Sequence, residues 1–149
     1  MTSIEVGVVV PRTRRDVWAE VRQIDRHVRW MSDARRIDFH SPQREGVGTT
    51  FDCRTRVGPF TTTDVMRVTR WEDDSLIGVT HQGIFTGHGE LRLSDEGDAT
   101  RVTWREHLVF PWWAGGAVGA ILARPVLRAL WRKNLATLAA LLTPPSGRP

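Results

Sequence analysis

The stretch that decides the fold is Leu127–Leu142, which reads LRALWRKNLATLAALL. If this stretch winds as an α-helix at 100° per residue, its apolar side chains fall into one stripe, and Arg128, Arg132 and Lys133 fall outside it. An amphipathic helix must bury its apolar stripe against another layer of the protein. The stripe consists of Leu127, Leu130, Trp131, Leu135, Leu138, Leu141 and Leu142.

The chain between residues 35 and 110 supplies the second layer. Apolar and polar side chains alternate there with a period of two, which is typical of strands with one buried face. Short turns such as Gly58-Pro59 separate the segments, so neighbouring strands are expected to pair as an antiparallel meander. The pattern does not separate the inward from the outward face of segment 60–71. The predicted strands are Ile37–Phe39, Phe51–Val57, Phe60–Trp71, Leu76–Gln82, Phe85–Ser94 and Thr100–Phe110.

The N-terminal segment adds one strand and two short helices. Apolar residues alternate along Ile4–Val10, and Pro11 ends this predicted strand. Thr13 is expected to cap a helix of about three turns that reaches Ile24. A second short helix is expected over Arg26–Met31.

These elements predict an α+β fold in which a curved antiparallel sheet of about six to seven strands grips the long C-terminal helix. That helix is expected to begin near Ala117, to be interrupted or kinked around Pro125, and to end at Leu142. Residues 1–142 are expected to form one ligand-binding domain, and residues 143–149 a disordered tail. Because a strongly curved sheet leaves space beside a single helix, a hydrophobic cavity between the two layers is predicted.

Composition narrows the classes of function. The chain has 149 residues, one cysteine and a formal net charge of +4, which fits one globular domain and excludes an internal disulfide. Its basic residues are scattered among acidic ones, so no nucleic-acid footprint is indicated. No apolar run reaches the roughly 18 residues of a membrane-spanning helix, and the N-terminus lacks the pattern of a secretory signal. We therefore expect a cytoplasmic protein without stable membrane insertion, and the sequence leaves the oligomeric state open.

Several short motifs occur in a fixed order along nearly the whole chain. They place a proline after the first strand, a Val-Trp pair in the first helix, and Thr-Arg or Trp-Arg groups in the later strands and the last helix. They are Val10-Pro11 with Val17-Trp18, Asp25 with Trp30-Met31, Gly46–Thr49, Val68–Glu72, Thr100–Trp104 and Leu130–Leu135. In this order the sequence resembles the START-like superfamily, also called SRPBCC or the polyketide cyclase/dehydrase and lipid-transport family.

The resemblance implies a helix-grip fold with a cavity between the sheet and the C-terminal helix. Members of the family bind lipids, sterols, polyketides or other apolar ligands, and some are cyclases or dehydratases. The superfamily has no shared catalytic motif, so no catalytic residue is carried over to this chain. Fold alone does not settle function.

Three polar residues stand at positions where the pattern predicts apolar ones. Asn134 lies near the middle of the helical stripe, where it either bonds to backbone or water or orients a ligand. Glu106 alternates with the apolar face of strand 100–110 and is a candidate general acid or base, unless a bulge turns it to solvent or an arginine pairs with it. His81 has the same parity as Ile77 and Val79, so it is either a proton shuttle or a core histidine satisfied by backbone.

The predicted cavity wall combines these three residues with their neighbours of the same parity. No metal or cofactor is predicted: His88-Gly89-Glu90 lacks the downstream cysteine pair of zinc deaminases, and Gly87-x-Gly89 lacks the third glycine of a dinucleotide site. Trp112 and Trp113 are expected at the entrance, where they gate the cavity or touch a membrane surface, or else cover the start of the helix. The expected ligand-binding residues are Phe51, Cys53, Thr55, Val79, His81, Val102, Trp104, Glu106, Leu127, Trp131, Asn134, Leu135 and Leu138.

Three functions stay open at this level. The first is a carrier or sensor of an apolar small molecule, such as a lipid or a polyketide. The second is a cyclase or dehydratase that uses Glu106, His81 or Asn134. The third is a protein-interaction module with a filled core, in which Trp112 and Trp113 contact a partner. The size of the cavity separates the third from the other two.

Overall fold

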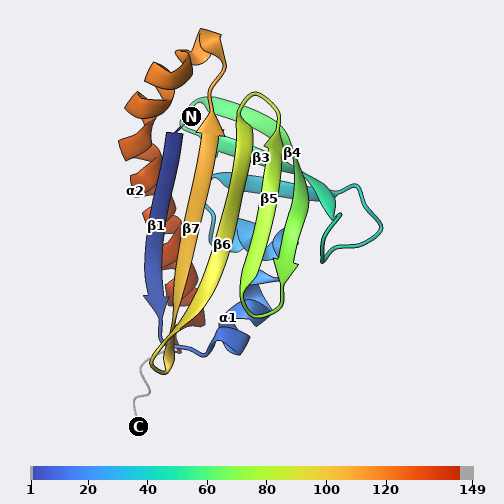
Figure 1. Cartoon of the computed structure of the whole chain (residues 1–149), viewed down its shortest axis with the longest axis vertical. Coiled ribbons are helices and arrows are strands. Elements are labelled where there is room, and N and C mark those ends of the chain that lie inside the picture. The colour runs from blue at the N-terminus through green and yellow to red at the C-terminus, as the bar shows by residue number, and fades with distance from the viewer. Residues whose placement is uncertain (1, 145–149) are drawn as a thin grey trace.

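The alternating segments form one antiparallel sheet of seven strands in the order β1-β7-β6-β5-β4-β3-β2 (Figure 1). The computed structural model describes residues 2–144; of the predicted disordered tail, 143–149, residues 145–149 lie outside the described residues. The strands are β1 (Thr2–Val10), β2 (Ala34–Phe39), β3 (Thr50–Val57), β4 (Phe60–Glu72), β5 (Leu76–Gln82), β6 (Thr86–Glu96) and β7 (Ala99–Val109). The helices are α1 (Arg14–Val21), η1 (Ile24–Arg29), η2 (Trp112–Ala114) and α2 (Gly116–Leu142), where η denotes a 3₁₀ helix.

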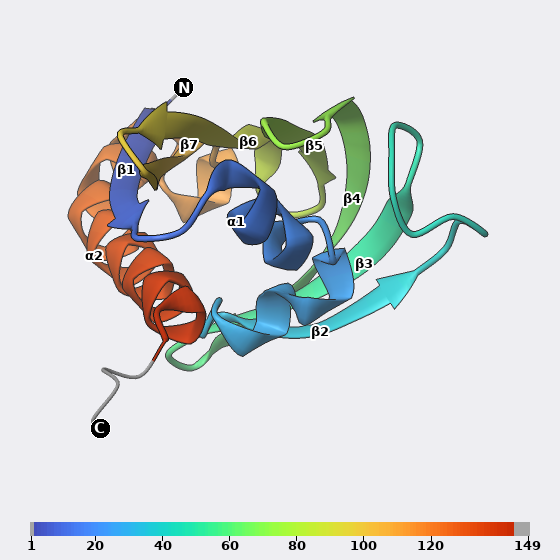
Figure 2. The same ribbon diagram turned by 90° about the horizontal axis from the view of Figure 1, so that it is seen from below.

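Strands β2 to β7 pair in chain order, as the short turns predict, and β1 closes the other edge by pairing with β7. Seen from below, the sheet curves from β1 round to β2, with α2 beside β1 and α1 at the open end (Figure 2). Helix α2 packs against β1 and β7. The predicted helix-grip architecture is therefore confirmed.

The first helix is shorter than predicted. Thr13 caps it as expected, and its side chain accepts a hydrogen bond from the backbone N–H of Asp16. The helix ends at Val21, because Gln23 leaves the helical backbone region (φ −85°, ψ 88°). Ile24 is buried, but it begins the 3₁₀ helix η1, which takes the place of the helix predicted over Arg26–Met31.

The last helix runs from Gly116 to Leu142 without the predicted interruption at Pro125. A proline inside a helix removes one backbone hydrogen bond, that to the carbonyl four residues earlier. Here the earlier residue is Ile121, which is exposed, so water can satisfy its carbonyl group. The cost of the proline is therefore small enough for one continuous helix. Within the described residues, none of the helices has the length and hydropathy to span a membrane.

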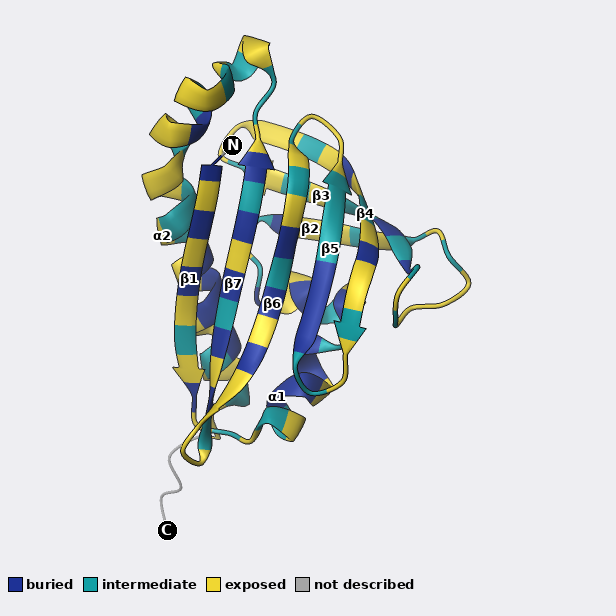
Figure 3. Ribbon diagram, in the orientation of Figure 1, coloured by how far each residue is buried: buried dark blue, intermediate teal, exposed yellow. Residues whose placement is uncertain are grey.

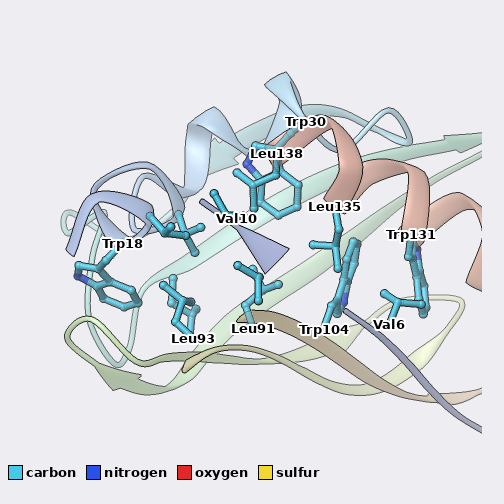
Figure 4. Close-up of a cluster of buried hydrophobic side chains, with 14 of the residues drawn as sticks. Val6, Val10, Trp18, Trp30, Leu91, Leu93, Trp104, Trp131, Leu135 and Leu138 are labelled. Atoms are coloured by element: carbon cyan, nitrogen blue, oxygen red, sulfur yellow. The ribbon is translucent and has the colours of Figure 1, made fainter. Parts of the chain in front are cut away.

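The main core lies where the C-terminal half of α2 meets the sheet (Figure 4). Leu135 and Leu138 are completely buried there. The rings of Trp104 on β7 and Trp131 on α2 stack with centroids 5.0 Å apart, and Trp30 packs edge-on against Trp104. The N-terminal half of α2 is different, since much of its surface is exposed (Figure 3). The C-terminal half of α2 therefore builds the core, whereas the N-terminal half keeps much of its surface in solvent.

Candidate ligand cavity

A cavity of about 580 Å³ lies between the curved sheet and the N-terminal half of α2. Four residues of α2 line it, namely Ala123, Val126, Leu127 and Trp131. The sheet contributes side chains from β2 to β7, because their concave faces all point to the same interior. Of the residues predicted to bind a ligand, those that line the cavity are Phe51, Cys53, Thr55, Val79, His81, Trp104, Glu106, Leu127 and Trp131.

Four predicted wall residues do not line the cavity, and for these the expectation is corrected. Val102, Leu135 and Leu138 are fully buried members of the main core, and Asn134 points to another partner, described below. The reason is that the C-terminal half of α2 packs directly on the sheet. The apolar stripe is continuous along the helix, but only its first half has empty space in front of it.

Two of the candidate polar residues meet inside the cavity. His81 Nε2 on β5 lies 2.9 Å from Glu106 Oε2 on β7, and Trp104 Nε1 donates a 3.0 Å hydrogen bond to Glu106 Oε1. Glu106 is 5% exposed, so the carboxylate is held almost entirely by protein. Of the alternatives left open for Glu106, the structure has the side chain turned inward, without a bulge in β7 at this position.

The contact between His81 and Glu106 crosses a whole strand. Strand β6 lies between β5 and β7, and its Gly89 is the register partner of both Val79 and Glu106. A Cβ atom at position 89 would overlap the carboxyl group of Glu106. The missing side chain of Gly89 therefore gives Glu106 the space to reach over β6 toward β5.

This environment acts on the protonation of His81. Burial by itself would lower the pKa of His81, but the hydrogen bond and the negative charge of Glu106, with a further contribution from Asp64, raise the pKa above the ordinary 6.5. At neutral pH, His81 is therefore protonated in a larger fraction of molecules than a histidine with the ordinary pKa would be. Because the pKa is higher in the folded state, the pair stabilises the fold fully below pH 6.5, and this contribution is lost as the pH rises through the raised pKa.

We expect the substitution Glu106→Gln to lower the pKa of His81, because desolvation then acts without the opposing carboxylate charge. An NMR titration of the His81 ring protons measures the change. The variant Glu5→Gln is the control, since it removes a carboxylate that pairs with Arg105 on the outer face of the sheet. A His81 pKa that stays raised in Glu106→Gln would show that the pair is not its source.

Two further carboxyl groups line the cavity and were not among the predicted residues. Asp64 lies on β4 and Asp33 just before β2. Burial raises the pKa of both carboxyl groups; the charge of His81 opposes this at Asp64, and a hydrogen bond from Asn134 opposes it at Asp33. The sequence could have predicted the position of Asp64. The two-residue Gly58-Pro59 turn makes Val57 the partner of Phe60, and this register places Asp64 opposite Cys53 on the same face of the sheet.

Asn134 is a structural residue in this fold. It is 1% exposed, and its Oδ1 accepts hydrogen bonds from the backbone N–H and the hydroxyl of Ser32, both at 3.0 Å. Its Nδ2 donates to Asp33 Oδ1 at 2.6 Å. Of the two readings of Asn134, satisfaction by neighbouring protein groups is the one that the contacts support. It ties α2 to the segment that leads into β2.

The remaining candidates differ in position. Cys53 faces the cavity, and burial raises the pKa of its thiol to about 11, which disfavours a nucleophilic thiolate. Trp113 lines the cavity, whereas Trp112 is 87% exposed and does not. Within residues 2–144, no group of three or more His, Cys, Asp or Glu side chains is arranged to hold a metal ion.

Exposed apolar side chains gather on the wall of the cavity near Trp113. Phe60 at the start of β4, Ile84 in the β5–β6 loop and Val126 on α2 each line the cavity and are also exposed to solvent. Trp113 has the same two properties, so four separate segments carry apolar side chains from the cavity to the surface. We call Phe60, Ile84, Trp113 and Val126 the mouth of the cavity.

Comparisons with solved structures agree on the fold at low sequence identity. A conserved protein from Geobacillus kaustophilus superposes with a TM-score of 0.79 at 10% identity, over 95% of each chain. The protein XoxI from Bacillus cereus gives a TM-score of 0.75 at 11% identity, over 95% of this chain and 96% of that one. Ginseng major latex-like protein 151 from Panax ginseng gives 0.71 at 9% identity, over 96% of this chain and 98% of that one.

Comparison with curated protein sequences gives no match. A family model described as polyketide cyclase / dehydrase and lipid transport, in contrast, matches residues 1–143. This match covers every strand and helix of the sheet-and-helix grip, including the segments that enclose the cavity. The chain therefore belongs to the polyketide cyclase/dehydrase and lipid-transport family.

Proposed function

We propose that this protein binds an apolar small molecule, such as a lipid or a polyketide-like compound, in the cavity between the sheet and α2, and acts as its carrier or sensor. The observation that carries the proposal is the cavity itself. Its volume of about 580 Å³ falls in the range of small-molecule sites, and its wall is mainly apolar, with a few polar groups at defined places. Family and fold support hydrophobic ligand binding in general.

The mouth gives this proposal a route for the ligand. Phe60, Ile84, Trp113 and Val126 keep apolar surface exposed at the edge of the cavity. An apolar molecule that passes between them leaves water gradually, which lowers the barrier to its exchange. In this proposal Trp113 acts at the entrance, and Trp112, which points into solvent, does not contact the bound ligand.

A second candidate function is catalysis, and one observation favours it. His81 and Glu106 form a buried hydrogen-bonded pair of titratable groups in the cavity wall. Such a pair can move a proton to or from a bound substrate, as a cyclase or dehydratase reaction requires. The third possibility, an interaction module with a filled core, is disfavoured by the volume of the cavity.

Native mass spectrometry of the protein purified from its source tests the binding function. We expect a co-purifying apolar molecule that organic extraction removes, and a purified protein that never carries or takes up one would contradict the proposal. The variants Glu106→Gln and His81→Ala then separate the two roles. If the identified ligand is turned over, and if turnover is lost at least about 100-fold while binding persists, the protein is an enzyme; if the ligand is retained unchanged, it is a carrier or sensor.

A further inference from the structure

The wall of the cavity carries a charge opposite to that of the whole chain. The chain has 21 lysine and arginine residues and a formal net charge of +4. Within the part of the chain that the structure describes, however, no lysine or arginine lines the cavity, and its basic side chains are histidines. The acidic side chains on the wall are Asp33, Asp64 and Glu106, because the carboxyl group of Glu90 pairs with Arg70 and Arg92 on the outer face of the sheet. Like-charge repulsion in a medium of low dielectric disfavours an anionic ligand here.

Two of these three carboxyl groups already have partners within the protein. The lone pairs and the charge of such a carboxylate are satisfied by protein groups, so a ligand does not have to supply a hydrogen-bond donor to it. The partners are His81 and Trp104 for Glu106, and Asn134 for Asp33.

Asp64 is the exception. It is 9% exposed, and its Oδ1 is buried without a hydrogen-bond partner among the described residues. A Cβ atom at Gly83 would overlap Oδ1, so backbone closes one side of this carboxyl group, while the residue as a whole lines the cavity. The other oxygen, Oδ2, is not enclosed in this way and also accepts no hydrogen bond from the described residues, so it is the oxygen that a donor supplied from the cavity would meet.

The neighbours of Asp64 do not supply this donor. His81 contributes positive charge nearby, but its Nε2 is held by Glu106 on the side away from β4. Cys53, the cross-strand partner of Asp64, has its sulfur within 3.8 Å of the Thr55 hydroxyl. Among the described residues, the carboxyl group of Asp64 therefore accepts no hydrogen bond from the protein.

We propose that the ligand of this cavity is an apolar molecule with a protonated amine, and that Asp64 binds this amine. The inference rests on the proposed function, that the cavity takes an apolar small molecule, and adds the chemistry of its polar group. The folded protein has already removed Asp64 from water, so the incoming ammonium group loses only its own hydration and gains a charge-assisted hydrogen bond. A carboxylate ligand of the same shape meets Asp33, Asp64 and Glu106 instead.

Three probes with the same aromatic body test the inference by isothermal titration calorimetry at pH 7: 2-naphthylmethylamine, 2-naphthylmethanol and 2-naphthylacetate. We expect the amine to bind at least about tenfold more tightly than the alcohol, and the acetate more weakly than both. Equal affinities for amine and alcohol, or tighter binding of the acetate, would overturn the inference and leave the proposed function standing. If none of the three binds to the folded protein, both fail.

The variant Asp64→Asn assigns the effect to one residue. It keeps the shape of the side chain and removes the charge, so we expect the preference for amine over alcohol to fall at least about tenfold while the affinity for the alcohol is retained. The matched control is Asp98→Asn, which removes an equal charge from the exposed β6–β7 turn and should leave the preference unchanged. An Asp64→Asn protein that is folded by circular dichroism and keeps the full preference would contradict the assignment.

Discussion

Replacement of Asn134 by leucine is expected to lower the free energy of unfolding by about 2 kcal/mol. The leucine would fit the apolar stripe of α2, but it would leave the backbone N–H of Ser32 and the carboxyl group of Asp33 without their partners. Ser32 is exposed and Asp33 is half-buried, so water replaces part of the lost bonding and the loss stays below the cost of two fully buried unpaired groups. Urea denaturation at pH 7, followed by tryptophan fluorescence, measures the loss.

The pH dependence of this variant gives an independent check. The hydrogen bond from Asn134 holds down the pKa of Asp33 against the effect of burial, so the variant should raise the pKa of Asp33 further. Because Asp33 is then easier to protonate in the folded state than in the unfolded state, the destabilisation should shrink as the pH falls toward 4.

The control is Thr137→Leu, an exposed position one turn further along the same helix. Its effect should stay within about 0.5 kcal/mol. If Asn134→Leu is as stable as the parent protein, the contacts with Ser32 and Asp33 do not hold α2 in place. The role of Asn134 would then have to be sought in ligand binding after all.

The substitution Val79→Trp is expected to weaken the binding of a neutral apolar probe, 2-naphthylmethanol, at least about tenfold. Val79 lies in the middle of β5, lines the cavity and is paired with Gly89 on β6. An indole ring at this position projects into the space between the sheet and α2, where it occupies volume that the ligand needs. Because the ring enters an existing cavity and not a packed core, the fold should survive the change.

Fluorescence titration of the probe measures this affinity, with the thermal unfolding temperature as a check of the fold. The matched control is Val65→Trp on β4, the same chemical change at a valine that is 42% exposed on the outer face of the sheet. That control should bind the probe like the parent protein. Unchanged binding in a folded Val79→Trp protein would mean that the probe is bound outside the cavity.

Much of the architecture could be predicted from local patterns. The apolar stripe of Leu127–Leu142 requires a covering layer, and the period-two segments can form only a sheet. Short turns between those segments force antiparallel neighbours, so the order of six strands follows from the chain itself. Strand parity pointed Glu106 and His81 toward the concave face, because side chains alternate with a period of two along a regular strand, but it left open a bulge that would turn Glu106 to solvent.

Other features depended on which strands stand next to one another. Glu106 reaches His81 because Gly89, which lies between their strands, has no side chain in the way. The role of this glycine cannot be inferred until the register of β6 with β7 is known. Asp64 is an intermediate case: its face was ambiguous within β4, but the pairing with Cys53 that fixes this face follows from the Gly58-Pro59 turn.

The sequence by itself determined the layers, the order of the strands and the inward side of most of them, since these depend on the spacing of neighbouring residues. Only the tertiary structure decided where the cavity ends along α2: Leu135 and Leu138 belong to the core alone, while Leu127 and Trp131 also line the cavity. It also decided that Asn134 is tied to Ser32 and Asp33. The physical reason is that an apolar stripe looks the same whether its neighbours fill the space in front of it or leave it empty. That difference is set by side chains distant in the chain.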